Sequence, residues 1–296
     1  MAAGASANLT FSVDNLGSVE DTFLLDVEVE PDLSSWWANQ SSNSSGNSSQ
    51  NGTGNSSGGN QSSPSMSVLM MGNSYTTSNN LALLVDKVLD ADGYNGSVTS
   101  RDAGGMSLAQ HWANVNTSGH SWNTTLRGNS WDYTILQDQS QIPSLPTTDS
   151  DWQASKNASV LLSEQIEVEG SETVLFMTWG RRSGESGTQW HQYNNINQNF
   201  TNMQERLTEG YTRYAENITA AGNTVWIAPV GLAFKTIHDA VEANGVDPTQ
   251  SGNLFYDLYT NDGSHPSLEG SYLAACVMHS TVTGESCVGS LSLIHI

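Results

Sequence analysis

The feature that most constrains the fold is a regular alternation of short apolar strands and amphipathic helices that begins near residue 66. Apolar runs bounded by turn residues predict strands at 67–71, 97–100, 133–137, 173–178 and 224–229. Apolar residues at helical spacing predict helices at 81–92, 107–114, 152–168, 199–221, 231–244 and 267–281. Strands separated by helices of this length favour right-handed crossovers and a mainly parallel sheet covered on both faces. The pattern therefore predicts a three-layer α/β/α domain.

The chain outside this alternation divides into three further segments. Residues 1–37 contain two strand-like runs, 8–13 and 22–29, separated by turn residues, which indicates the C-terminal fragment of a β-sandwich. A free-standing hairpin that packs on the next domain is the alternative. Residues 38–65 are almost wholly Asn, Ser, Gly, Gln and Thr, a composition typical of a flexible linker. The main domain is expected at 66–290. Residues 291–296 look like a translated sequencing adapter and are interpreted as a non-native tail.

The charge of the chain argues against a nucleic-acid partner, and its hydropathy argues against a membrane span. Thirty acidic residues against nine basic ones give a formal net charge of −21, and so negative a surface repels phosphate backbones. We therefore expect no nucleic-acid partner. No apolar run approaches the roughly 20 residues that a helix needs to cross a bilayer, so no membrane span is predicted.

Two further observations concern the compartment in which the protein works. Asn-X-Ser/Thr sequons recur along the chain and are densest in the 38–65 linker, which suggests an exported glycoprotein at the cell surface or outside the cell. The first residues lack the features of a signal peptide, so the chain is interpreted as an internal fragment.

The two cysteines, Cys276 and Cys287, could form one bridge or remain reduced, and they exclude a zinc site of several thiolates.

Two short motifs carry residues suited to nucleophilic catalysis. The first, Gly72-Asn73-Ser74, places a hydroxyl just after a predicted strand and before a helix, whose N-terminal N–H groups favour negative charge. The second contains Asp262 and His265, spaced so that the carboxylate can reach the imidazole within one turn and leave its other nitrogen free to accept a proton. Taken separately, each motif is also compatible with an ordinary turn that caps a helix.

Together these segments resemble the SGNH hydrolase superfamily, the GDSL-like lipases and esterases, over roughly residues 66–290. Gly72-Asn73-Ser74 matches the Gly-Asp-Ser-like nucleophile block, in a Gly-Asn-Ser variant, and Asp262-Gly-Ser-His265 matches the Asp-X-X-His block. The resemblance implies a flavodoxin-like parallel sheet and metal-independent ester hydrolysis without a cofactor. Ser74 would be the nucleophile, His265 the general base and Asp262 the residue that orients His265.

The resemblance also implies the donors of an oxyanion hole. These are the N–H groups of Ser74 and of Gly105, which follows the second predicted strand of the domain. The third block of the family, Gly-X-Asn-Asp, is not matched, because this chain reads Gln137-Asp138-Gln139 there. Gln139 falls at the position of the amide donor Asn, and Gln137 is the alternative. Asn73 in place of the family's Asp is a second departure, and it removes a charge beside the nucleophile.

Residues that follow the fourth predicted strand of the domain are expected on the rim of the site. Trp179 and Arg181 are therefore candidate substrate-binding residues, although an arginine in so acidic a chain can simply pair with a nearby carboxylate. Trp112, Trp190 and Tyr193 are further aromatic rim candidates, whose flat faces suit sugar rings. The histidines lack the spacing of zinc ligands and no phosphate-binding loop is present, so no metal or cofactor is expected.

These observations predict a serine esterase that hydrolyses short-chain esters, with O-acetyl groups on a carbohydrate as the expected substrate. The partner would then be a small-molecule or glycan ester. The alternative is a catalytically inactive SGNH scaffold that serves as a glycan-binding or adhesive surface module. The sequence leaves the oligomeric state and the acyl chain of the substrate open.

Overall fold

A computed structural model describes residues 9–13, 25–29, 63–185 and 195–287. Its central sheet has five parallel strands in the order β4-β3-β5-β6-β8. These strands are β3 (Ser65–Gly72), β4 (Asn95–Asp102), β5 (Tyr133–Leu136), β6 (Glu172–Phe176) and β8 (Val225–Ala228). Counted along the domain, the order is 2-1-3-4-5, which is the flavodoxin-like arrangement.

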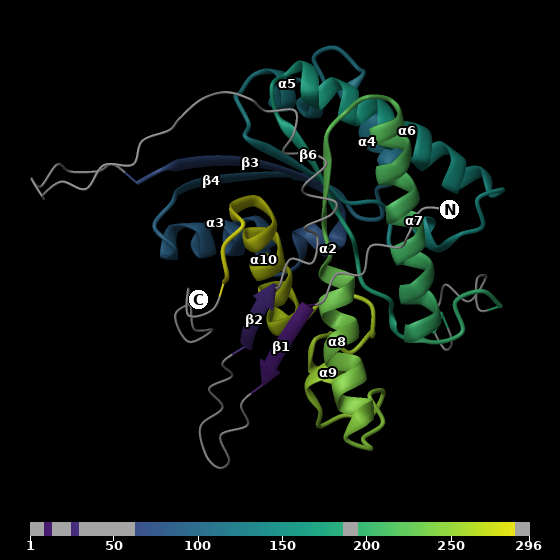
Figure 1. Cartoon of the computed structure of the whole chain (residues 1–296). Helices are drawn as coiled ribbons and strands as arrows, with labels where there is room; N and C mark the ends of the chain where they lie inside the picture. Colours follow the sequence, from purple (N-terminus) through teal and green to yellow (C-terminus); the bar gives the residue numbers. More distant parts are fainter. Residues whose placement is uncertain (1–8, 14–24, 30–62, 186–194, 288–296) are drawn as a thin grey trace, which may run out of the picture.

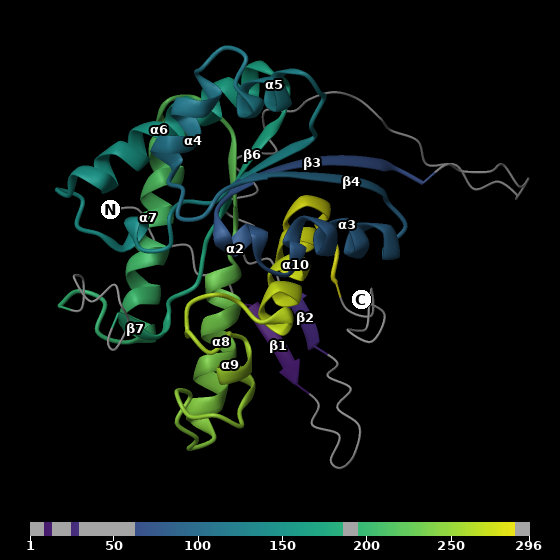
Figure 2. The same cartoon turned by 180° about the vertical axis from the view of Figure 1, so that it is seen from behind.

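Helices cover both faces of this sheet (Figures 1 and 2). One face carries α3 (Leu81–Ala91), α8 (Val230–Ala243) and α10 (Leu268–Thr283). The other carries α4 (Leu108–Val115), α6 (Ser150–Val168) and α7 (Phe200–Ala220). The predicted three-layer α/β/α fold is therefore confirmed.

Strand β3 shows how the sequence creates two separate cores. Val68 and Met70 belong to the core beneath α3, α8 and α10, whereas Leu69 and Met71 belong to the core beneath α4, α6 and α7. All four side chains are at most 1% exposed. Because successive side chains of a strand point to opposite faces, a strand buried on both sides reads as a continuous apolar run rather than as an alternating one.

The five predicted strands and the six predicted helices of the domain are present, with ends displaced by a few residues. The short elements were not predicted. They are α2 (Ser74–Thr77), α5 (Ser121–Arg127), β7 (Arg182–Glu185) and α9 (Leu254–Asp257), with the 3₁₀ turns at Ser78–Asn80 and Ile142–Ser144. Segments of three to seven residues contain too few apolar positions for periodicity to identify them.

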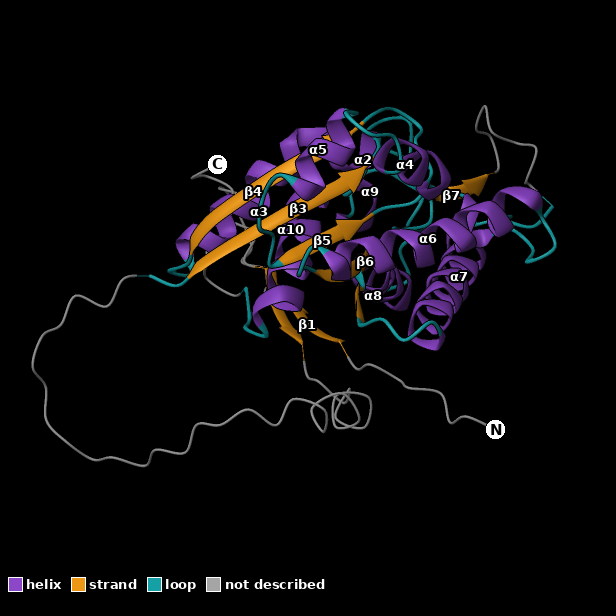
Figure 3. Cartoon of the chain, turned by 90° about the horizontal axis from the view of Figure 1, so that it is seen from above, coloured by secondary structure: helices purple, strands orange, loops and turns teal. Residues whose placement is uncertain are grey.

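The two strand-like runs near the N-terminus form an antiparallel pair, β1 (Leu9–Val13) and β2 (Leu25–Val29). β1 lies beside α8 and β2 beside α10 (Figure 1), and Figure 3 shows β1 and the central sheet from above. The predicted linker, 38–65, overlaps the first residue of β3, because Ser65 already pairs with Asn95 in the sheet. Most of the linker and the tail at 291–296 lie outside the described residues, so these assignments and the β-sandwich origin of 1–37 stay predictions.

Cys276 on α10 and Cys287, which follows this helix, are joined by a disulfide, with their Cα atoms 5.3 Å apart. The structure thus selects one of the two states that the sequence left open. Among the described residues, no helix is both long and apolar enough to cross a membrane.

Candidate active site

The strand order brings the predicted motifs to one edge of the sheet. β3 lies between β4 and β5, and the chain leaves β3 toward β4 but later returns to pair β5 on the other side. In parallel sheets, ligands bind at such a reversal, beyond the carboxyl ends of the strands. Ser74 follows β3 there, and Gln139 follows β5.

The turn after β3 needs a glycine and an asparagine for different reasons. A Cβ atom at Gly72 would overlap Thr76 Oγ1 and lie 2.7 Å from Gln137 Oε1, so no larger residue fits. Asn73 is the N-cap of α2, and its Oδ1 accepts a hydrogen bond from Tyr75 N–H at 3.1 Å. Ser74 is consequently the first residue of this short helix.

The buried side chain of Asn73 also connects three separate turns. Its Oδ1 accepts from Gln137 Nε2 at 2.7 Å, after β5. Its Nδ2 donates to Met106 O at 3.0 Å, in the turn between β4 and α4, and to Asp138 O at 3.2 Å. An amide can act as donor and acceptor at once, which a carboxylate cannot do. The departure from the family's Asp at this position therefore fits the local bonding.

Three side chains from two distant segments form a hydrogen-bonded chain. His265 Nε2 lies 2.9 Å from Ser74 Oγ, and His265 Nδ1 lies 2.6 Å from Asp262 Oδ2. Because an ionised carboxylate can only accept, Nδ1 carries the proton and Nε2 is free to accept one from the Ser74 hydroxyl. The side chains of His265 and Asp262 are 38% and 50% exposed, so this chain of groups is open to solvent.

Asp262 serves the backbone and His265 with different oxygens. Its Oδ1 accepts hydrogen bonds from the N–H groups of Ser264 at 2.8 Å and His265 at 2.9 Å, and from Thr260 Oγ1 at 2.8 Å, while Oδ2 binds the imidazole. Partial burial acts to raise the pKa of Asp262, but these hydrogen bonds outweigh it and lower the pKa to about 2. Asp262 thus forms an Asx turn but does not cap α10, whose N-cap is Ser267, and its second oxygen contacts the imidazole.

A column of aromatic rings supports the turn that carries His265. Tyr75 stacks on Trp179 with ring centroids 4.7 Å apart, and Trp179 stacks on Phe234 at 4.5 Å. Tyr75 Oη lies 2.8 Å from Ser264 Oγ, and Trp179 Nε1 donates to Ser264 O at 3.0 Å. The rings of His265 and Tyr75 meet in a T-shaped arrangement with their centroids 5.5 Å apart. Tyr75, the residue next to Ser74, is thus packed against and hydrogen-bonded to the turn that bears the imidazole.

The predicted oxyanion donors lie at the start of α2 and in the segments that follow β4 and β5. The N–H groups of Ser74 and Gly105 have no acceptor among the described residues. Gly105 is exposed, has φ +71° and would place an added Cβ in open space. Gln139 is half-buried. Gln137 is buried, and its Nε2 donates one hydrogen bond to Asn73 Oδ1 and the other to Asp138 O. Gln137, the alternative donor, therefore has no hydrogen left for a substrate.

The expected rim positions of Trp179 and Arg181 are wrong. Trp179 is fully buried within the aromatic column, and Arg181 is 2% exposed. The Arg181 guanidinium pairs with Glu185 at 2.6 Å and donates to Gln141 Oε1 at 2.8 Å. The sequence placed both residues after β6 correctly, but the segment turns inward because its side chains find partners there. Pairing with a carboxylate, the second interpretation of Arg181, is the one observed.

The other aromatic rim candidates receive little support. Trp112 is partly buried and packs against the core beneath α4. Trp190 and Tyr193 lie outside the described residues.

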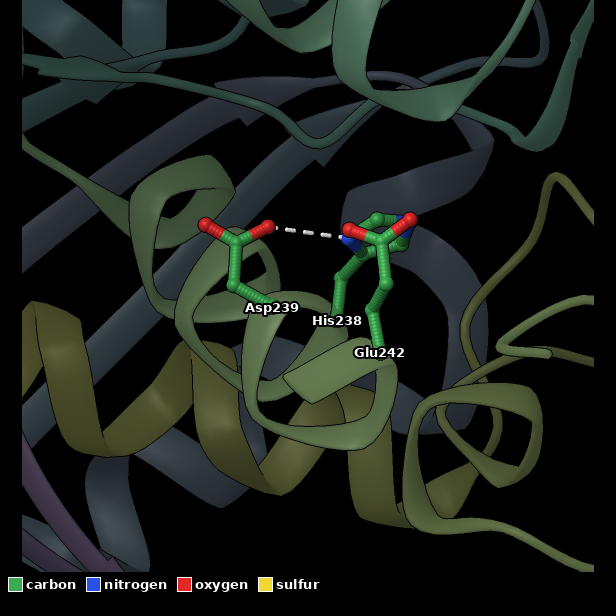
Figure 4. Close-up of side chains that lie close together, drawn as sticks. All are labelled: His238, Asp239 and Glu242. Carbon is green, nitrogen blue, oxygen red and sulfur yellow. Dashed lines mark hydrogen bonds and ion pairs between the residues drawn. The ribbon is translucent and has the colours of Figure 1, made fainter. Parts of the chain in front are cut away.

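Three potential metal ligands cluster on α8, as Figure 4 shows. His238, Asp239 and Glu242 each place a ligand atom within 4.8 Å of the others. Asp239, however, already pairs with Lys235 and accepts a hydrogen bond from His238 Nδ1 at 2.9 Å. The His238 ring also stacks on Phe200 at 4.7 Å. Side-chain pairing and packing thus account for this cluster without an ion.

Sequence reasoning missed Asp138, which is fully buried beneath the site. Its Oδ1 accepts from the N–H groups of Leu108 at 2.9 Å and Gln139 at 2.8 Å and from Ser155 Oγ at 3.0 Å, and its Oδ2 accepts from Tyr214 Oη at 3.0 Å. The carboxylate thereby links the turn after β4 to the turn after β5. A usable signal was present, because an Asp directly after a buried strand with no basic neighbour needs several donors.

This burial predicts how Asp138→Asn changes stability with pH. Burial raises the pKa of Asp138 from 3.8 to about 6, against the effect of its hydrogen bonds. Between these values the folded chain binds more protons than the unfolded chain, so the contribution of Asp138 to stability falls as the pH rises. The difference in the pKa of Asp138 between the unfolded and the folded chain corresponds to about 3 kcal/mol of folding stability.

We therefore expect the Tm of Asp138→Asn, relative to wild type, to increase by roughly 6–12 °C between pH 4 and pH 7. Differential scanning calorimetry at both pH values measures this. A Tm difference that does not change with pH contradicts the prediction.

Comparison with solved structures identifies the family. A candidate SGNH hydrolase from Slackia heliotrinireducens is 27% identical with a TM-score of 0.55, and the match covers 73% of this chain and 98% of the other. A DUF4886 family protein from Bacteroides uniformis shares the fold at a TM-score of 0.59 and 18% identity, covering 77% of this chain and 86% of the other. No protein-family model matches, and curated proteins gave no significant match. The fold, the order of its motifs and the Slackia likeness together show that this chain belongs to the SGNH hydrolase superfamily.

Proposed function

We propose that the protein is a metal-independent serine esterase with Ser74 as its nucleophile. The observation that carries the proposal is the chain of hydrogen bonds from Ser74 Oγ through His265 to Asp262, at 2.9 and 2.6 Å. This is the geometry that an acyl-transfer triad needs. It also argues against an inactive scaffold, in which nothing would keep these three side chains aligned.

In the first half of the reaction, Ser74 Oγ attacks the ester carbonyl and His265 Nε2 takes its proton. The tetrahedral intermediate collapses, the bond to the alcohol breaks, and His265 returns the proton to the leaving alkoxide. In the second half, His265 accepts a proton from water, and the hydroxide attacks the acyl-enzyme. This second intermediate collapses, the bond between the acyl carbon and Ser74 Oγ breaks, and His265 returns its proton to Ser74 Oγ as the acid is released. Asp262 holds His265 in the required tautomer and stabilises the imidazolium.

The negative charge of each intermediate requires hydrogen-bond donors in fixed positions. We assign these to the N–H groups of Ser74 and Gly105 and to the Gln139 side-chain amide. Donors of this kind act about 2.7–3.1 Å from the developing oxyanion. The N–H groups of Ser74 and Gly105, which have no acceptor within the described part of the chain, support the assignment.

For the substrate, we propose short-chain esters, in particular O-acetyl groups on a carbohydrate. The support is the exposure of the site: Asp262 and His265 are 50% and 38% exposed, and Gly105 faces open space. A nucleophile at the protein surface can reach an ester on a bulky polymer without enclosing the polymer. We further propose an extracellular or cell-surface location, which the Cys276–Cys287 disulfide supports because such bonds persist in oxidising compartments.

Covalent labelling tests the enzyme proposal. A fluorophosphonate probe is expected to label wild-type protein at Ser74, as mapped by peptide mass spectrometry, and to label His265→Gln far more slowly because Ser74 then lacks its base. Glycan binding without any labelling would instead identify an inactive binding module.

The substrate proposal has its own test. A series of p-nitrophenyl esters is expected to show highest kcat/KM at two to four carbons, and an acetylated polysaccharide should release acetate. Peak activity beyond about eight carbons with no acetate released would identify a lipase.

A further inference from the structure

The half-buried side chain of Gln139 is fixed at both ends of its carboxamide by a single neighbour, Gln141. Gln139 Oε1 accepts from Gln141 N–H at 3.0 Å, and Gln139 Nε2 donates to Gln141 Oε1 at 3.0 Å. Turning the amide over would lose both bonds, so its orientation is determined. One hydrogen of Nε2 is used in this way, and the described part of the chain offers the other hydrogen no acceptor.

The oxygen that holds Gln139 is itself strongly held. Gln141 Oε1 also accepts from Arg181 Nη2 at 2.8 Å and from Ser140 Oγ at 3.1 Å. Gln141 is 6% exposed and Arg181 is 2% exposed, so these bonds are shielded from water. Arg181 Nη1 is paired with the fully buried Glu185 at 2.6 Å, which fixes the guanidinium and balances its charge. A bond from a buried cation to an amide oxygen is among the stronger hydrogen bonds in a protein.

We propose that Gln141 and Arg181 are positioning residues for the oxyanion donor Gln139, an inference that rests on the proposed function. Arg181 fixes Gln141 Oε1, this oxygen fixes Gln139 Nε2, and the remaining N–H of Gln139 keeps one direction. A glutamine side chain has one more rotatable bond than the asparagine that the superfamily resemblance implies here. That extra freedom must be removed before the reaction for the donor to act as a preorganised group. The buried arginine thereby serves catalysis without contacting the substrate.

The test is a double-mutant cycle on the complete chain with p-nitrophenyl acetate. Gln141→Met removes the acceptor at similar side-chain length. It is expected to lower kcat about 10- to 30-fold and to leave KM within about twofold of wild type. This loss is smaller than the roughly 10²–10³-fold loss in kcat that follows removal of an entire oxyanion donor. Gln139→Ala is expected to lower kcat about 10²-fold. Because Gln141 acts through Gln139, adding Gln141→Met to Gln139→Ala should change kcat by less than twofold. Losses that multiply in the double variant overturn the proposal.

A conservative variant separates positioning from general damage. Gln141→Glu keeps an acceptor for both Gln139 and Arg181, so its kcat should stay within about threefold of wild type. If Gln141→Met does not fold, Arg181→Lys replaces it in the same cycle, since a lysine keeps the charge beside Glu185 but presents no planar pair of donors. A wild-type kcat for Gln141→Met, or for Arg181→Lys where it replaces Gln141→Met, overturns the proposal.

Ser74→Ala distinguishes this inference from the proposed function. If Ser74→Ala keeps its activity, the serine esterase proposal fails. If Ser74→Ala is inactive while the Gln141 and Gln139 effects are independent, only the positioning role fails.

Discussion

Ser74→Ala is expected to lower kcat for p-nitrophenyl acetate about 10⁴- to 10⁶-fold, the range that loss of a triad nucleophile produces. The reason is that no other hydroxyl in the described residues shares a hydrogen bond with His265 Nε2. The variant keeps the N–H of residue 74, so residual activity would come from substrate binding and the remaining oxyanion donors.

Stability measurements make this result interpretable. Among the described residues, the Ser74 hydroxyl makes one side-chain hydrogen bond, to His265 Nε2, so its loss should move the Tm by no more than a few degrees. Steady-state kinetics and calorimetry on the same preparation supply both values. Activity of Ser74→Ala within tenfold of wild type would assign the nucleophile to another residue.

The second large effect concerns stability and comes from Asn73→Asp, the change toward the family's own residue. Asn73 is 2% exposed, and its Nδ2 donates to the carbonyl oxygens of Met106 and Asp138. An aspartate would turn a carboxylate oxygen toward those two acceptors and leave a buried charge without a cation. We expect a loss of about 3–5 kcal/mol of stability, or roughly 6–20 °C in Tm.

A matched variant isolates the cause. Asn95→Asp makes the same chemical change at an exposed position and should leave the Tm within about 2 °C of wild type. Because protonation removes the buried charge, the Tm deficit of Asn73→Asp should narrow as the pH is lowered toward 4. Thermal melts at pH 4 and 7 measure both effects. An unchanged Tm for Asn73→Asp would show that the hydrogen bonds of the Asn73 side chain to the neighbouring turns contribute little to stability.

The elements that sequence could predict are those whose signal lies within one segment. The apolar run of β3 and the helical spacing from Leu81 onward depend only on neighbouring residues. The closeness of Ser74 and His265 followed from two motifs at strand and helix ends, because parallel topology gathers such ends at one edge. The resemblance to a known family supplied the roles.

Each of the two residues that sequence misplaced has at least one partner far away in the chain. Trp179 is buried because Tyr75 and Phe234 stack on its two faces, and neither lies near it in sequence. Arg181 turns inward because Glu185 and Gln141 offer it acceptors within the same pocket of side chains. Residue type alone suggests exposure for an arginine, and only the three-dimensional set of acceptors reverses that expectation.

The aromatic column of Tyr75, Trp179 and Phe234 has a consequence for how such an enzyme can diversify. It joins α2, which bears Ser74, to the turn that bears His265 through the interior rather than through the segments that would meet a substrate. The spacing of the reactive pair is therefore uncoupled from the composition of the outer loops. We therefore expect that grafting of other outer loops onto this domain alters the substrate range and leaves the distance between Ser74 Oγ and His265 Nε2 unchanged.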